Sequence, residues 1–105
     1  MKDYDTPKQV NLKMKPKVSD LKTQKILDEI YKGQNAKSQV GNGTMMDAIR
    51  NERKTGKPTR GRLHTKKGKA AIKLLNACLG SGKLDDRDKA AVRAIMDDLK
   101  KALSS

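Results

Sequence analysis

Apolar residues recur at three- and four-residue spacing through most of residues 65–103, and this periodicity most restricts what the chain can fold into. One helical face is formed by Ala71, Leu74, Leu75, Cys78 and Leu79. A second face is formed by Val92, Ile95, Met96, Leu99, Ala102 and Leu103. Only Gly80-Ser81-Gly82 and a few polar residues separate the two, with Gly80 as the stop of the first helix and Asp85 as the cap of the second. The pattern therefore predicts an antiparallel helical hairpin.

A shorter helix is predicted before the hairpin. Thr44 precedes Asp47 by three residues, the spacing at which a hydroxyl accepts a hydrogen bond from the backbone N–H of the third helical residue. Gly56 permits a left-handed exit, and Pro58 keeps the residue before it out of the helical conformation. The helix is therefore expected to end near Lys54.

The first 37 residues are interpreted as an N-terminal arm or linker followed by the first helix. Residues 1–17 show no steady period, whereas the next segment places apolar residues on one helical face. Ser19 is the predicted N-cap of this helix, and Gly33 its left-handed end. Residues 38–105 are then the domain that carries the function.

The core of such a chain has to be small and aliphatic. At 105 residues the chain has enough length for one hydrophobic core. Hydrophobic residues make up 34% of it, with no Trp, no Phe and two Tyr, so Leu, Ile, Val, Met and Ala must fill the interior. The prediction is an all-α fold, a small compact domain of about four helices that ends in the antiparallel hairpin.

The chain carries a net charge of +13, and nearly half of it lies in residues 59–73, which contain six cations and no acid. Such an excess favours an anionic partner, nucleic acid first. Without Trp or Phe a base-stacking platform is disfavoured, so we expect contacts mainly to phosphate. The predicted phosphate or RNA ligands are Arg50, Arg60, Arg62, Lys66, Lys67 and Lys69.

The sequence predicts no metal and no other cofactor. A single cysteine, Cys78, excludes an internal disulfide and a cysteine-based zinc site, and one histidine does not complete a metal cluster. A Mg²⁺ ion held by carboxylates stays open on sequence alone. No apolar run reaches the roughly 20 residues that a membrane-spanning helix needs, so no membrane span is expected.

His64 is the leading candidate for catalysis, because histidine is the side-chain type that exchanges protons near neutral pH. Cleavage of RNA without a metal needs a base for the 2′-hydroxyl, an acid for the leaving 5′-oxygen, and cations for the charge on phosphorus. Asp47 or Glu52 could supply the second titrating group if the break after the short helix folds it back beside His64. Thr65, as the N-cap of the next helix, would aim backbone N–H groups at phosphate.

Simpler explanations exist for the same residues. A lone histidine in a basic loop is more often solvated than catalytic, Asp47 is more often a helix cap, and Glu52 is more often solvated. Three functional alternatives therefore stay open: a non-enzymatic nucleic-acid-binding protein, a protein-interaction module whose positive face docks an acidic partner, and a metal-dependent DNase.

Residues 41–105 resemble the toxin modules at the C-terminus of contact-dependent growth inhibition exoproteins, the CdiA family, and of related filamentous-haemagglutinin-like polymorphic toxins. The resemblance is carried by GNGT at 41–44, DAIR at 47–50 with Glu52, Thr55-Gly56 with Pro58, and a G-x-x-H-x-x-K group. The last group is Gly61, His64 and Lys67, and an amphipathic hairpin ending in DDLKKAL follows it.

The resemblance implies an antibacterial toxin that is delivered from a secreted or cell-surface exoprotein into the cytoplasm of a target cell. Many such modules are ribonucleases, frequently acting on tRNA, and each is neutralised by a cognate immunity protein, here expected to be acidic. Some require a target-cell translation factor such as elongation factor Tu. By this analogy His64 is the main catalytic residue, and the candidates around it are Arg50, Glu52, Thr59, Arg60 and Lys67.

Overall fold

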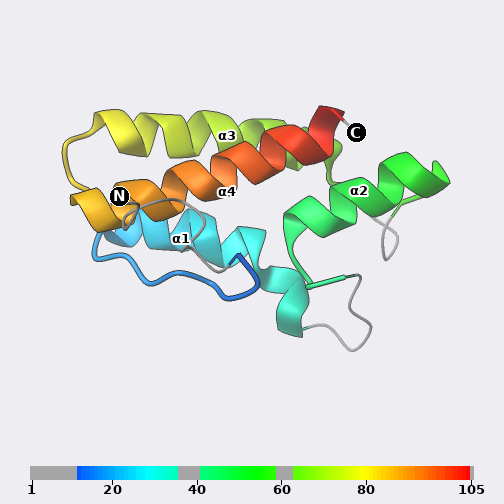
Figure 1. The fold of residues 1–105 in the computed structure, drawn as a ribbon, viewed down its shortest axis with the longest axis horizontal. Helices are drawn as coiled ribbons and strands as arrows, with labels where there is room; N and C mark the ends of the chain where they lie inside the picture. The colour runs from blue at the N-terminus through cyan, green and yellow to red at the C-terminus, as the bar shows by residue number, and fades with distance from the viewer. Residues whose placement is uncertain (1–11, 36–40, 59–62, 105) are drawn as a thin grey trace, which may run out of the picture.

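The computed structural model describes residues 12–35, 41–58 and 63–104, and all regular structure within these ranges is helical. In chain order the elements are α1 (Leu21–Ile30), the short 3₁₀ helix η2 (Lys32–Asn35), α2 (Met45–Thr55), α3 (Thr65–Gly80) and α4 (Asp86–Ser104) (Figure 1). The predicted all-α fold of about four helices is confirmed.

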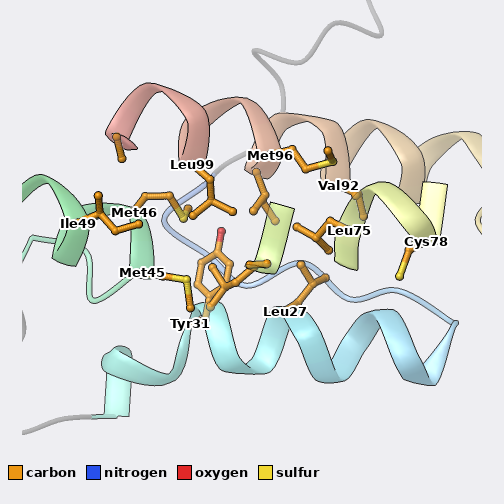
Figure 2. Close-up of a cluster of buried hydrophobic side chains, with 14 of the residues drawn as sticks. Leu27, Tyr31, Met45, Met46, Ile49, Leu75, Cys78, Val92, Met96 and Leu99 are labelled. Carbon is orange, nitrogen blue, oxygen red and sulfur yellow. The ribbon is translucent and has the colours of Figure 1, made fainter. Parts of the chain in front are cut away.

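The helices α3 and α4 lie side by side and run in opposite directions, which confirms the predicted hairpin (Figure 1). Helix α1 lies along the hairpin, and α2 contacts both α3 and α4 at the end where α3 begins and α4 finishes. The interior between them is aliphatic apart from one tyrosine ring (Figure 2). Its fully buried larger side chains include Leu27, Ile30, Met46, Ile49, Leu75, Val92, Ile95 and Leu99.

Both ends of α2 were predicted correctly. The Thr44 hydroxyl accepts a hydrogen bond from the Asp47 N–H at 3.2 Å, and Gly56 follows the helix with a φ of 72°. Just before the cap, Gly43 has a φ of 76°, and a Cβ there would lie 2.9 Å from the Gln34 Cα. The glycines before α2 thus serve a tight turn against η2.

The predicted ends of α1 were wrong. Its N-cap is Asp20, whose carboxylate accepts from both the backbone N–H (3.1 Å) and the hydroxyl (2.6 Å) of Thr23, and these bonds lower the Asp20 pKa. Ser19 instead directs its N–H to Asp88 of α4 at 3.5 Å. The helix ends at Ile30, and Gly33 lies inside η2 without a positive φ.

The turn of the hairpin differs from the prediction by two residues. Gly80 is the last residue of α3, and the left-handed glycine is Gly82, with a φ of 79°. Between them the Ser81 hydroxyl donates to the Cys78 carbonyl at 2.7 Å and accepts from the Lys83 N–H at 3.2 Å. Helix α4 begins as predicted, because the Asp85 carboxylate accepts from the Asp88 N–H at 2.8 Å.

The described part of the N-terminal segment folds back along α1. The Tyr31 hydroxyl donates to the Leu12 carbonyl at 2.8 Å, and the Gln34 amide donates to the Lys13 carbonyl at 2.7 Å. The predicted boundary between residues 37 and 38 lies outside the described residues. Residues on both sides of it, from α1 and from α2 to α4, share one core cluster. The division into an arm and a functional domain therefore stays a prediction.

Within residues 12–35, 41–58 and 63–104, no helix is both long and apolar enough to span a membrane.

Candidate active site

Helix α2 carries one acid on its buried face. Met45, Ile49 and Glu52 stand at helical spacing on the side that packs against α3 and α4, and the Glu52 side chain is 3% exposed. A carboxylate so far from water is costly unless hydrogen bonds satisfy it. Glu52 therefore needs partners from a neighbouring element.

The start of α3 provides those partners. The backbone N–H of His64 donates to Glu52 Oε1 at 2.6 Å, and His64 Nδ1 lies 2.5 Å from Glu52 Oε2. The His64 side chain is 13% exposed. The two residues are 12 apart in sequence, so the chain between α2 and α3 has to reverse to bring them together. The sequence left Asp47 and Glu52 open as the second titrating group and favoured a solvated Glu52; the structure instead buries Glu52 and brings it to His64.

With Glu52 ionised, its contact with the ring assigns a role to each imidazole nitrogen. An ionised carboxylate only accepts hydrogen bonds, so the contact with Glu52 places a hydrogen on Nδ1. In the neutral ring the other nitrogen, Nε2, is then the proton acceptor. Among the described residues, none hydrogen-bonds to Nε2. A histidine oriented through Nδ1 by a carboxylate, with Nε2 left for the reaction, is the arrangement of a general base.

The position at the N-cap of α3 is the part of this region that was predicted wrongly. His64 occupies it, and Thr65 is the first helical residue. His64 makes no side-chain cap, because its ring is held by Glu52, but its carbonyl accepts from the Gly68 N–H at 2.8 Å. His64 is thus held at the start of α3 by its backbone carbonyl and against α2 by its ring.

The first two turns of α3 are strongly basic. They contain Lys66, Lys67 and Lys69, all exposed, and no acid in the first turn. Cations at a helix N-terminus oppose the helix dipole, so this sequence is unfavourable for the helix by itself and favourable for holding an anion there. The three lysines predicted to bind phosphate therefore lie next to His64 in sequence and on the exposed side of the same helix.

Asp47 and Arg50 belong to a different contact. Arg50 bonds to Asp47 at 2.9 Å and to Asp98 of α4, and the hydrogen bond with Asp98 is the main cause of a raised Arg50 pKa. Asp47 also accepts from the Asn42 N–H at 2.7 Å, and it makes no hydrogen bond or ion pair with His64. The structure therefore brings Glu52, and not Asp47, to the histidine, and Arg50 ties α2 to α4.

Three predicted site residues, Thr59, Arg60 and Arg62, lie outside the described residues, as does Gly61. Their predicted roles stay predictions. In the ranges that the structure describes, no three His, Cys, Asp or Glu side chains gather closely enough to hold a metal ion.

Sequence reasoning missed two features of this site. One is the hydrogen bond that the His64 backbone N–H donates to the buried Glu52 carboxylate; the helical spacing of Met45, Ile49 and Glu52 is the signal that could have indicated this burial. The other is Gly68, a buried glycine inside α3, where an added Cβ would lie 2.5 Å from the Ile49 Cδ1. A glycine in a helix interior is the signal that could have pointed to it.

Comparison with known proteins gives no match among protein-family models, curated proteins or solved structures.

Proposed function

We propose that this protein is a metal-independent ribonuclease in which His64, oriented by Glu52, moves the proton. The observation that carries the proposal is the buried pair itself: His64 Nδ1 lies 2.5 Å from a carboxylate that is 3% exposed, beside a run of exposed lysines. The oriented imidazole supplies a base and the lysines supply cations, two of the three components that transphosphorylation of RNA needs.

In the proposed reaction Nε2 of His64 takes the proton of a ribose 2′-hydroxyl, and the 2′-oxygen attacks the adjacent phosphorus. The bond from phosphorus to the 5′-oxygen breaks and leaves a 2′,3′-cyclic phosphate. The leaving oxygen takes its proton from solvent or from a second acid. Glu52 stabilises the imidazolium that forms, and Lys66, Lys67 and Lys69 offset the charge that builds up on the phosphate oxygens.

The resemblance to contact-dependent growth inhibition toxins extends this proposal. It supports tRNA as the substrate, delivery from a cell-surface exoprotein into the cytoplasm of a target bacterium, and an acidic cognate immunity protein as the natural inhibitor. A translation factor such as elongation factor Tu is a further proposed partner. The charge of the chain, +13, suits both an RNA and an acidic protein.

A non-enzymatic RNA-binding protein is the second candidate, and one observation favours it. Glu52 bonds to the backbone N–H of His64 as well as to the ring, so the pair has a structural use that needs no catalysis: it fastens the start of α3 to α2. In that case the lysines alone carry the function.

The two candidates separate when purified protein is incubated with total bacterial RNA, with and without EDTA. The ribonuclease proposal expects discrete tRNA fragments that persist in EDTA and end in a cyclic phosphate. His64→Ala should abolish them, and Glu52→Gln should slow their formation by at least about 10-fold, because the ring loses its charged partner. Cell extract is added to a parallel reaction to supply any translation factor.

Glu29→Gln is the matched control, since Glu29 is an exposed acid on α1. Filter binding to uncleaved RNA is measured for every variant. Cleavage by His64→Ala at the rate of the unmodified protein would refute the proposed mechanism, and RNA that binds but stays intact with extract present would favour the binding protein.

A further inference from the structure

Helix α3 contains a glycine at a position where helices ordinarily avoid one. Gly68 is the fourth residue of α3, its φ is not positive, and it is buried. Glycine in a helix interior lowers stability relative to alanine, because it loses more backbone freedom on folding. Close packing against a neighbouring helix is a physical reason for a glycine at such a position.

The neighbour that leaves no room is Ile49 of α2. A Cβ added to Gly68 would lie 2.5 Å from the Ile49 Cδ1, well inside the closest approach that two carbon atoms tolerate. The atom in the way is the end of a side chain, which can shift, but Ile49 is 0% exposed, so a shift presses its methyl against the close-packed core. Gly68 therefore sets how closely α2 and α3 approach each other.

The contact between Gly68 and Ile49 lies about one helical turn from His64 on α3 and from Glu52 on α2. Gly68 donates its N–H to the His64 carbonyl at 2.8 Å, and Glu52 follows Ile49 by three residues on the buried face of α2. We propose that Gly68 is a positioning residue, whose lack of a side chain lets α2 come close enough to α3 for Glu52 to hold the His64 ring. The expected effect of Gly68 on the cleavage rate rests on the proposed function, whereas its expected effect on the orientation of the His64 ring does not.

The test uses the tautomer of His64, which is the single histidine in the chain and so gives one set of imidazole nitrogen resonances. In the unmodified protein ¹⁵N NMR above neutral pH should show hydrogen on Nδ1, the less common form of a free histidine side chain. Gly68→Ala should shift the ring towards the Nε2–H form and lower cleavage by about 10-fold or more. Glu52→Gln gives the reference spectrum for a ring without its carboxylate.

Ile49→Val supplies a rescue, because valine lacks the Cδ1 atom that an alanine at 68 would strike. Alone it should lower the melting temperature by about 4–8 °C and keep the Nδ1–H form. Combined with Gly68→Ala it should restore both the tautomer and the cleavage rate. Gly80→Ala is the matched control, because Gly80 lies in the same helix with nothing within 4 Å of an added Cβ. It should change neither the tautomer of His64 nor the cleavage rate.

Retention of the Nδ1–H form in folded Gly68→Ala would overturn the proposal, and so would a double variant that stays unfolded or stays in the Nε2–H form. If Gly68→Ala alone fails to fold, recovery of the fold and of the Nδ1–H form in the double variant supports the proposal. Absence of cleavage in all proteins, with the tautomer changing as expected, would refute the proposed ribonuclease but leave the role of Gly68 established.

Discussion

At the scale of single residues, Glu52 brings a charge into the face of α2 that otherwise carries Met45, Met46 and Ile49. Burial of an unpaired carboxylate would cost several kcal/mol. Two N–H groups of His64, one from the backbone and one from the ring, offset that cost, so neither residue can be changed without affecting the other. Orientation of the histidine and attachment of α3 to α2 are therefore one interaction.

Tyr31 provides a prediction about pH. Burial, with Asp98 as a second and smaller cause, raises the pKa of Tyr31 to about 12. Because the folded state holds the phenol proton more tightly than the unfolded chain, this contribution to stability is complete below pH 10 and is lost as pH rises towards 12. Tyrosinate absorbance should therefore include a late step, near pH 12, that belongs to Tyr31.

Tyr31→Phe should remove the later step. The helical circular dichroism is followed in parallel, so that ionisation in the folded protein is distinguished from ionisation after unfolding. A single step at the ordinary tyrosine pKa, with the helices still intact, would contradict the prediction.

At the scale of helices, the end of α2 depends on one backbone conformation. Gly56 has a φ of 72°, and nothing lies within 4 Å of a Cβ added there. Gly56→Ala therefore meets no steric obstacle, and its whole cost is the left-handed conformation, about 1 kcal/mol. The melting temperature should fall by about 4–8 °C.

Gly80→Ala is the comparison for Gly56, because it also has open space but lies at the end of a right-handed helix. It should be neutral or slightly stabilising. Equal stability of the two alanine variants in thermal melts would show that the conformation at 56 does not limit the stability of α2.

Helices and their order could be predicted from the sequence because apolar periodicity reflects the same burial that folds the chain. The hairpin, the Thr44 and Asp85 caps and the Gly56 exit are all local patterns with one good solution. The ends of α1 and the hairpin turn could not be predicted so well. Ser19 and Asp20 are both good caps by residue type; in the structure Asp20 caps the helix, and the Ser19 N–H is directed to Asp88 of α4.

The site was predictable in part for the same reason. The break at 55–58 indicated that an acid of α2 could meet His64, but the sequence favoured a solvated Glu52, and its burial was not predicted. Asp47, equally acidic, is used by Asn42 and Arg50, and no local pattern told the two acids apart. The close approach at Gly68 depends on two helices meeting in space, which sequence spacing does not encode.

At the scale of the molecule, the positive charge is unevenly distributed. Residues 74–105, which include α4, carry six cations and five acids, whereas α3 has four lysines and no acid. A diffuse charge and a localised site make different predictions for RNA binding. Phosphate contacts release counterions, so the slope of log Kd against log salt reports how many phosphates are neutralised, about 0.7 per contact for a single strand.

Two triple variants distinguish these cases, and each removes three charges from the same net +13. One changes the exposed lysines near His64 to glutamine: Lys66, Lys67 and Lys69. The other changes exposed lysines on α1 and in the hairpin turn: Lys22, Lys25 and Lys83. The start of α1 and the hairpin turn both lie at the end of the molecule opposite the start of α3 (Figure 1).

Binding is measured at several salt concentrations with His64→Ala present in every protein, so that the RNA stays intact. The first triple should reduce the slope by up to about 2, because three phosphate contacts are lost, and the second should leave it nearly unchanged. Equal losses in both would mean that RNA responds to the total charge, and the start of α3 would then hold no special place in binding. A loss confined to the first would place the bound phosphates beside the histidine that is proposed to act on them.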